Sequence, residues 1–346
     1  NLGGISNFSG NIYFSADGGD CKGNIIEDCV LNKSQEGYGI TFVSLNGECS
    51  GNRISGCSVI GHPWGGIALE SYTDGTNINN TINNCVINGD GGSCIRLYAS
   101  RGACNANLIK DNSMGGMAYG VYLEAVFGNV MGNLIKNCTM TDNWWYGVVI
   151  DDGLNGLCGG NSFEECTISG NSYYGVLLHA GSITTNIRGN KFKDCNIHGN
   201  GDAGFAISCN GGGRSEGNVI QNCSITTNSS HGIYMYGATG YCRNNIIKNC
   251  SIIENAGYGI YIRGGSGETA WNHIEGNFVS VQDNDISNVG INTESATESM
   301  LFSNIAMNFS TNFWLDATDT YGPIVTNTGA LSSTGDSSHP RANFSR

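Results

Sequence analysis

The chain has 346 residues, including 53 Gly, 15 Cys and only 3 Pro, and its formal net charge is -13 at pH 7. Apolar residues make up 39% of the sequence and can form a core, whereas charged residues make up only 13%. The acidic balance argues against a nucleic-acid partner, because phosphate binding requires clustered Lys and Arg. No run of about 18 apolar residues occurs, so we expect no membrane span.

A unit of 26–29 residues repeats along most of the chain. Each copy carries an asparagine at the same place, and the copies fall at Asn24, Asn52, Asn80, Asn107, Asn133, Asn161, Asn190, Asn218, Asn245 and Asn272. A period this constant over so many copies indicates an architecture of stacked repeats.

Within each copy, apolar residues alternate in short runs. In the copy that starts at Asn245, Ile247 and Ile252 flank Cys250, and a second run, 259–262, reads Gly-Ile-Tyr-Ile. Short alternating runs separated by Gly and Asn turns indicate strands. We therefore predict an all-β fold, a parallel β-helix (solenoid) of about ten to eleven coils with two or three strands per coil. Equivalent residues would stack about 4.8 Å apart, so the asparagine column should form a ladder.

The cysteines also fall into columns. The main column contains Cys29, Cys57, Cys85, Cys138, Cys166, Cys195, Cys223 and Cys250. A second column contains Cys21, Cys49, Cys104, Cys158 and Cys242. In both columns the cysteines alternate with core Ile or Val positions. We therefore expect their side chains to point inward as mostly free thiols that act as small hydrophobes. The Cys-x-x-Cys spacing typical of zinc sites is absent, and we predict no metal site of that kind. Cys21 and Cys49 are column neighbours within reach of a disulfide.

The repeat loses its register near residue 290. Gly290-Ile291 arrives late, and no Cys follows Cys250. We predict a parallel β-helix over residues 1–290 and a C-terminal region, 291–346, that forms a final irregular coil or a cap. A cap would cover the unpaired strand edge at the end of a solenoid.

The unit Asn-x-Ile-x-x-Cys/Asn-x-Ile…Gly-Ile-x-Leu resembles the short repeat of right-handed parallel β-helix proteins of the pectate-lyase-like group. The resemblance covers about residues 1–290 and implies a right-handed coil. Proteins of this fold include lyases, hydrolases, epimerases, tailspikes, adhesins and surface-layer proteins, so the resemblance assigns no single activity.

Carboxylates gather on the outward face of the second strand. Glu124 and Asp151 fall in adjacent coils, Asp152 follows, and His179 lies one coil further on. Such groups could share a proton, hold Ca²⁺, or act as acid and base on a glycosidic bond. An enzyme would use these four residues, with Arg96 or Arg263 as the charge partner.

Three observations weigh against this enzyme hypothesis. A face of about twenty side chains contains some carboxylate pair by chance, and the uniform coil lengths leave no long loops to wall a cleft. The polygalacturonase-like motifs are met only by Asp151-Asp152-Gly153 and, in part, by Ser230-His231-Gly232. The residues therefore favour no catalytic set.

Aromatic residues cluster in the turn before the second strand. They are Tyr38, Trp64, Tyr119, Trp144, Trp145, Tyr146, Tyr173, Tyr174 and Tyr258. Exposed aromatics one coil apart could stack on sugar rings or contact a partner subunit. They could equally pack on one another and shield the turn.

Nine Asn-x-Ser/Thr sequons permit glycosylation in an exported protein. They start at Asn7, Asn32, Asn79, Asn137, Asn222, Asn228, Asn249, Asn308 and Asn343.

The favoured hypothesis is an exported structural protein, extracellular or at the cell surface, without a cofactor. It would build a surface layer, sheath, filament or fibre by self-association or with other surface proteins, and it could bind a polysaccharide. The alternative is a polysaccharide lyase or glycoside hydrolase acting on an acidic or neutral polymer.

Overall fold

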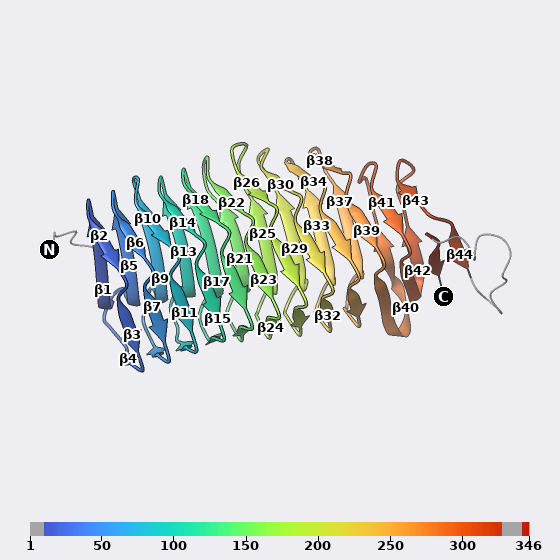
Figure 1. The fold of residues 1–346 in the computed structure, drawn as a ribbon. Helices are drawn as coiled ribbons and strands as arrows, with labels where there is room; N and C mark the ends of the chain where they lie inside the picture. The colour runs from blue at the N-terminus through green and yellow to red at the C-terminus, as the bar shows by residue number, and fades with distance from the viewer. Residues whose placement is uncertain (1–9, 327–340, 346) are drawn as a thin grey trace.

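The computed structural model describes residues 10–326 and 341–345, which form a rod of stacked coils (Figure 1). The strand ladders are parallel along the rod, and the described residues contain no helix, so the predicted all-β parallel β-helix is confirmed. Accordingly, no helix in 10–326 or 341–345 could serve as a transmembrane segment.

A regular coil has four strands, one more than the largest number expected. Strands β14, β15, β16 and β17 form one such coil. The first three are only three residues long, and two-residue corners separate them. The first residue of each corner has a left-handed backbone, Ala106 (φ 54°) and Asp111 (φ 57°) in this coil. Runs of three residues are too short to show as separate alternating strands in the sequence, which explains the wrong count.

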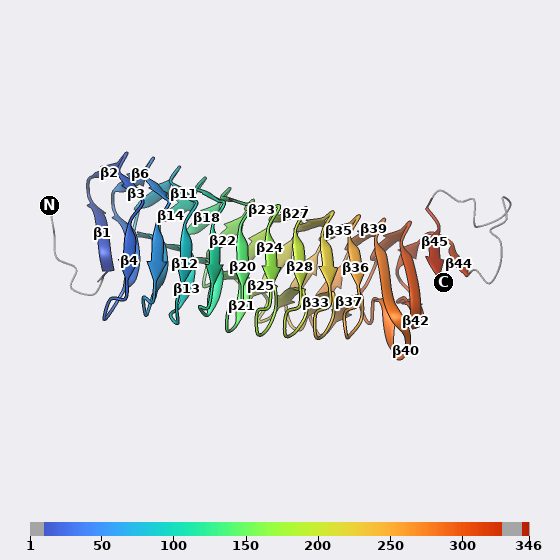
Figure 2. The same ribbon diagram turned by 90° about the horizontal axis from the view of Figure 1, so that it is seen from below.

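The four strands of each coil stack into four parallel columns, seen from two sides in Figures 1 and 2. The first stack contains β2 (Asp20–Lys22), β6 (Glu48–Ser50), β10 (Thr76–Ile78), β14 (Ala103–Asn105), β18 (Asn129–Met131), β22 (Leu157–Gly159), β26 (Asn186–Arg188), β30 (Arg214–Glu216), β34 (Tyr241–Arg243) and β38 (Glu268–Ala270). The second stack contains β3 (Ile25–Glu27), β7 (Arg53–Ser55), β11 (Thr81–Asn83), β15 (Leu108–Lys110), β19 (Leu134–Lys136), β23 (Ser162–Glu164), β27 (Lys191–Lys193), β31 (Val219–Gln221), β35 (Ile246–Lys248), β39 (His273–Glu275), β41 (Met300–Phe302) and β43 (Thr320–Tyr321).

The third and fourth stacks merge at the C-terminal end of the rod. The third contains β4 (Val30–Asn32), β8 (Ser58–Ile60), β12 (Val86–Asn88), β16 (Ser113–Gly115), β20 (Thr139–Thr141), β24 (Thr167–Ser169), β28 (Asn196–His198), β32 (Ser224–Thr226) and β36 (Ser251–Ile253). The fourth contains β1 (Gly10–Asp17), β5 (Tyr38–Leu45), β9 (Gly65–Tyr72), β13 (Ser93–Ser100), β17 (Tyr119–Val126), β21 (Tyr146–Asp152), β25 (Val176–Ala180), β29 (Phe205–Cys209), β33 (Ile233–Gly237) and β37 (Ile260–Gly264). The long strand β40 (Phe278–Asn292) pairs with both β36 and β37.

Parallel stacking continues past residue 290. Strand β41 pairs with β39, and β42 (Ile305–Trp314) pairs with β40. The last described strands, β44 (Ile324–Thr326) and β45 (Asn343–Ser345), pair with each other, and β45 also pairs with β42. The first part of the predicted C-terminal region thus extends the rod, and its capping role stays a prediction.

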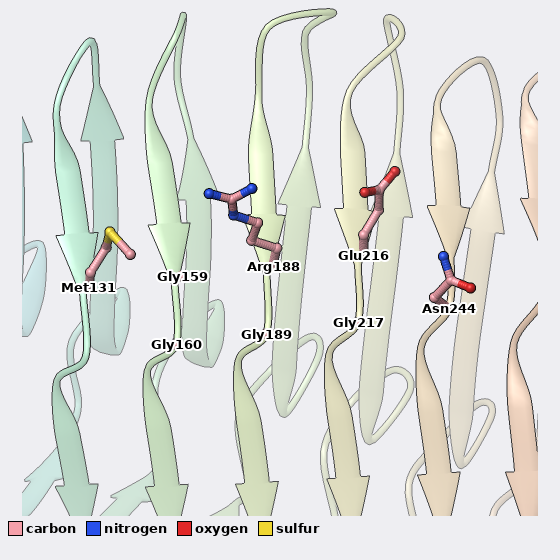
Figure 3. Close-up of a pocket in the computed structure, with 8 residues that line it drawn as sticks. All are labelled: Met131, Gly159, Gly160, Arg188, Gly189, Glu216, Gly217 and Asn244. Carbon is pink, nitrogen blue, oxygen red and sulfur yellow. The ribbon is translucent and has the colours of Figure 1, made fainter.

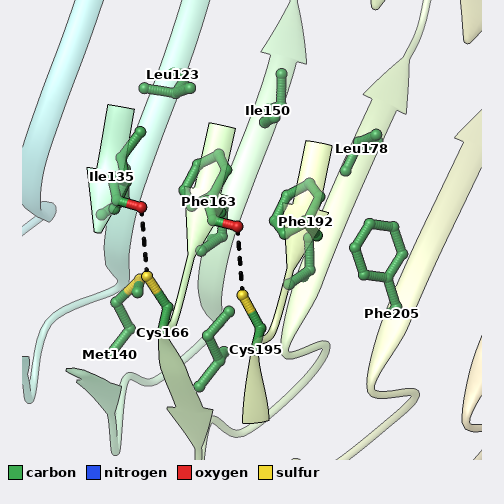
Figure 4. Packing of buried hydrophobic residues seen from close by; sticks show 14 of the residues in the cluster. Leu123, Ile135, Met140, Ile150, Phe163, Cys166, Leu178, Phe192, Cys195 and Phe205 are labelled. Carbon is green, nitrogen blue, oxygen red and sulfur yellow. Dashed lines mark hydrogen bonds between the residues drawn. The ribbon is translucent and has the colours of Figure 1, made fainter. Parts of the chain in front are cut away.

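Identical side chains stack inside the rod. The rings of Phe163 and Phe192 lie 4.6 Å apart and nearly parallel, and Phe205 meets Phe192 edge-on at 4.8 Å (Figure 4). The thiols of Cys166 and Cys195 donate to the carbonyl oxygens of Ile135 and Phe163 at 3.6 and 3.5 Å (Figure 4). A core of this kind combines dense packing with satisfied polar groups.

Most cysteines are buried free thiols, as predicted. Thirteen are free, and all but the half-buried Cys29 are buried. Burial raises the pKa of Cys138 to about 11, so its thiolate is scarce at neutral pH. One disulfide joins Cys209 of β29 to Cys242 of β34, while Cys21 and Cys49 remain thiols.

The predicted asparagine ladder is present and a second one accompanies it. In the first ladder, each buried amide nitrogen donates to the next side-chain oxygen, for example Asn190 to Asn218 at 3.0 Å. The second ladder consists of Asn143, Asn171, Asn200, Asn228 and Asn255. Its members follow the main cysteine column by five residues, a spacing that the sequence displayed. Both ladders satisfy buried backbone groups at the corners of the coils.

Candidate functional site

Two outward columns of side chains run along the fourth stack. Val149 pairs with Tyr122 on one side and Leu177 on the other, and Asp151 pairs with Glu124 and His179. We call the first set the central column: Arg96, Tyr122, Val149, Leu177, Ala206 and Tyr234. We call the second set the polar column: Tyr98, Glu124, Asp151, His179, Ser208 and Tyr236. The register predicted from the sequence for this face is confirmed.

Residue size along the central column creates a groove. Val149, Leu177 and Ala206 form a low floor, and the large side chains of Tyr122 and Tyr234 stand at its two ends. The groove has a volume of about 580 Å³. Tyr122 and Tyr234 are four strand steps apart, roughly 19 Å. The long axis of the groove therefore follows the rod and crosses the strands.

Stacked aromatic rings form one wall of the groove. The rings of Tyr119 and Tyr146 are 6.0 Å apart, and those of Tyr146 and Tyr174 are 5.7 Å apart and nearly parallel. Trp145, which is 49% exposed, meets Tyr119 edge-on at 5.5 Å. Burial raises the pKa of Tyr119 and of Tyr174 to about 12, so both phenols remain hydrogen-bond donors at neutral pH.

A carboxylate–imidazole pair forms the opposite wall. His179 Nδ1 lies 3.3 Å from Asp151 Oδ1, and Ser208 and Asn210 continue this wall. The hydrogen bond to Asp151 raises the pKa of His179 above its ordinary value, although burial opposes this effect. At neutral pH the pair can both accept and donate hydrogen bonds toward the groove.

Glu124 is already engaged by a partner. Arg96 donates to Glu124 at 2.7 Å and to the buried Glu70 at 3.1 Å, and its guanidinium lies 4.2 Å from the ring centre of Tyr98. Arg96 also donates to the Tyr38 hydroxyl at 3.2 Å. Burial raises the pKa of Glu70, and the charge of Arg96 opposes that rise. This network holds Glu124 next to Asp151 but leaves it paired.

The remaining members of the enzyme hypothesis are Asp152 and Arg263. The side chain of Asp152 lies outside the described residues, although its backbone pairs with Ala125 and Ala180. Arg263 is four strand steps from Asp151, roughly 19 Å along the rod. Of the predicted catalytic residues whose side chains the structure describes, Asp151 and His179 line the groove.

The predicted aromatic residues divide into two groups. Tyr119, Trp145, Tyr146 and Tyr174 line the groove. The others pack elsewhere: Tyr38 is buried against Trp64, Tyr173 lies against Tyr146, Tyr258 packs on His231 and Tyr261, and Trp144 is 48% exposed outside the groove lining.

Sequence reasoning gave no special weight to the two end tyrosines. Tyr122 and Tyr234 are absent from the predicted site residues, and their position at the ends of a groove was not predicted. The sequence signal that could have indicated the groove is the change from large to small and back to large side chains along the central column.

The sequons divide by burial. Asn228 and Asn343 are buried, and their amide nitrogens donate to Asn255 and to backbone carbonyls, so neither can carry a glycan in the folded protein. Asn7 lies outside the described residues. Six sequon asparagines are exposed and stay predictions: Asn32, Asn79, Asn137, Asn222, Asn249 and Asn308.

A shallower hollow lies where the first stack turns into the second. Its volume is about 460 Å³, and Figure 3 shows Arg188 on the coil next to Gly159 and Gly160, with Glu216 on the coil after it. The Glu216 carboxylate accepts from Arg243 at 2.6 Å. This hollow has no aromatic lining among the described residues, which makes it the weaker candidate for a binding site.

The chain belongs to the family described as right handed beta helix region, whose model matches residues 120–305. The predicted right-handed β-helix and the resemblance to the pectate-lyase-like group are thereby confirmed. A second model, periplasmic copper-binding protein (NosD), matches residues 3–134. No curated protein matches the sequence significantly.

Solved structures share the fold at low identity. The periplasmic alginate epimerase AlgG is 14% identical with a TM-score of 0.57, over 93% of this chain and 73% of that one. The catalytic domain of a GH87 alpha-1,3-glucanase is 15% identical with a TM-score of 0.58, over 89% and 62%. The Azotobacter vinelandii mannuronan C-5 epimerase AlgE6 A-module is 14% identical with a TM-score of 0.52, over 98% and 91%.

The residues do not fit a copper site of the kind that the second family description names. Among the side chains that the structure describes, no group of three His, Cys, Asp or Glu is placed to hold a metal ion. In the matched segment, the ring nitrogens of His62 lie 3.0 Å from Ser34 Oγ and 3.3 Å from the Leu31 carbonyl oxygen. Both nitrogens are therefore committed to hydrogen bonds within the fold.

Proposed function

We propose that this protein is an exported or periplasmic β-helix protein that binds a segment of polysaccharide in the groove between Tyr122 and Tyr234. The observation that carries the proposal is the aromatic wall facing a polar wall across an apolar floor. Aromatic faces suit the apolar faces of sugar rings, and a few polar groups then fix orientation. The match to the periplasmic NosD family model and the structural likeness to a periplasmic alginate epimerase and an alpha-1,3-glucanase support this class of function.

The direction of the groove favours a polymer over a small ligand. Its walls repeat once per coil, because Tyr119, Tyr146 and Tyr174 occupy equivalent places in successive coils. A chain of sugar units laid along the rod would meet a ring at each step. The stacked backbone beneath makes the site rigid, which lowers the entropic cost of binding.

The test uses two variants that act on the groove in opposite ways. Tyr146→Ala removes a ring from the wall, and Ala206→Tyr fills the floor. A tyrosine fits this face, since Tyr234 already occupies the next place in the same column. Trp144→Ala is the matched control, because Trp144 is exposed beside the wall but does not line the groove.

The readout is retention on a panel of immobilised polysaccharides, followed by calorimetry with oligosaccharides of the polymer that binds. Tyr146→Ala should weaken binding about 3- to 10-fold, the value of one aromatic contact. Ala206→Tyr should abolish binding, and Trp144→Ala should leave it unchanged. Unchanged affinity in both groove variants would refute this location of the site.

A second candidate function, a polysaccharide lyase or glycoside hydrolase, is favoured by the contact between Asp151 and His179. A carboxylate and an imidazole with a raised pKa can share acid and base roles at one bond. Release of new reducing ends from the bound polymer, lost in Asp151→Asn, would support it. Binding without any cleavage would leave the protein a binding module.

The building-block hypothesis also remains a proposal. The straight rod of parallel coils is compatible with end-to-end association at the cell surface or in an extracellular assembly. Electron microscopy of the protein from its source would show filaments or sheets with an axial repeat near the rod length. Dispersed particles would argue against it.

A further inference from the structure

The groove has a distinctive balance of charge. Asp151 and His179 are its charged or readily charged lining groups, and they lie 3.3 Å apart, so each offsets the other when His179 is protonated. No Lys or Arg occurs among the described residues that line the groove. A ligand carboxylate would find no unshared positive charge there.

The surroundings add negative charge. Burial is the main cause of the raised pKa of Tyr174, and the charge of Asp202 adds to it. The same holds for Tyr119, where Tyr146, Asp151 and Glu124 add to the effect of burial. The negative charge of Asp202 therefore reaches the aromatic wall at Tyr174, and the negative charges of Asp151 and Glu124 reach it at Tyr119.

The two nearest cations are outside the lining and have other contacts. Arg96 is held between Glu70 and Glu124 by two ion pairs. Arg263 lies on the strand that follows the end of the groove, 5.5 Å from the centre of the Tyr236 ring, and its charge and hydrogen bond oppose the effect of burial on the pKa of Tyr234. Next to it, the Tyr261 hydroxyl donates to Glu294 at 2.5 Å, so a further carboxylate faces this end.

We propose that the groove selects a glycan whose units carry no acidic group, that is, neutral or amino-sugar units. This inference rests on the proposed function. Hydroxyl groups can donate to Asp151 and accept from His179 without an uncompensated charge. A uronate unit would place a second carboxylate beside Asp151 in a partly desolvated site, and like charges at that range repel strongly.

The test compares three sets of hexasaccharides by calorimetry at fixed pH and 0.15 M ionic strength. The sets are neutral glucans of several linkages, glucosamine oligomers, and uronate oligomers. We expect the best neutral or glucosamine ligand to bind at least about 10-fold tighter than any uronate ligand. Asp151→Asn and Asp202→Asn should each narrow that difference several-fold, because each removes one negative charge. Arg263→Gln tests the cation at the end of the groove and should change the ratio by less than about twofold. Arg188→Gln, in the hollow between the first and second stacks, is the matched control for the loss of one positive charge.

For each of the three ligand sets, loss of binding in Ala206→Tyr would show that the ligand occupies the groove. Uronate-preferring binding that Ala206→Tyr abolishes would overturn this inference and leave the proposed function intact. An affinity ratio between neutral and uronate ligands that changes in Arg263→Gln but not in Asp151→Asn would also overturn the inference. Failure of every oligosaccharide class to bind would instead overturn the proposed function, and the inference with it.

Discussion

Removing one rung of the first asparagine ladder should destabilise the rod strongly. The Asn190 side chain makes four hydrogen bonds in a fully buried position. Its amide nitrogen donates to the Cys158 carbonyl at 3.1 Å and to Asn218 Oδ1 at 3.0 Å. Its oxygen accepts from the backbone and side-chain nitrogens of Asn161 at 3.1 and 3.0 Å. Asn190→Ala deletes all four.

The expected decrease in the free energy of unfolding follows from the number of hydrogen bonds that Asn190→Ala removes. A buried neutral hydrogen bond contributes about 0.5–1.5 kcal/mol net, so four of them give roughly 2–6 kcal/mol. Asn24, at the N-terminal end of the same ladder, is half-buried and donates to Asn52 Oδ1 at 2.9 Å and Cys21 Sγ at 3.2 Å. Water can replace these contacts, so Asn24→Ala should cost only about 1 kcal/mol.

Guanidinium unfolding followed by circular dichroism would rank the two variants. Stacked repeats can unfold in parts, so the midpoints are compared and hydrogen exchange supplies the local readout. In Asn190→Ala, the Asn161 amide should exchange faster than in the parent protein, because its acceptor is gone. Equal midpoints for the two variants, with unchanged exchange at Asn161, would refute the assignment of net stability to the ladder.

Two further predictions concern titration and thiol chemistry. In an NMR titration, His179 should have a pKa above the reference value of about 6.5, and Asp151→Asn should lower it. Because the pKa of His179 is raised in the folded state, the pair stabilises the fold below about pH 6.5, and this stabilisation is lost as pH rises through the folded pKa. Both side chains are about one third exposed, so the stabilisation should be small. Alkylation of the denatured protein without reductant should label 13 thiols, and with reductant 15, since Cys209 and Cys242 are paired. A count of 15 before reduction would contradict that pairing.

The sequence alone determined the coil and its register. Each copy of the repeat carries the same residue types in the same order, so the position of Asn190 above Asn161 follows from the period. The same reasoning placed the cysteine columns inside and put Asp151 between Glu124 and His179 on the outward face. In a solenoid each residue contacts its equivalents one coil away, so a linear period becomes a spatial neighbourhood without knowledge of long-range folding.

Only the tertiary structure decided the contacts between different positions of the coil. The groove depends on the sizes of Val149, Leu177 and Ala206 relative to the aromatic residues at the start of the fourth-stack strands, such as Tyr119 of β17 and Tyr146 of β21. The disulfide likewise joins strands of different stacks. Such contacts depend on the corner angles and on the width of the coil. The repeat period measures spacing along the rod and carries no information about distances across it.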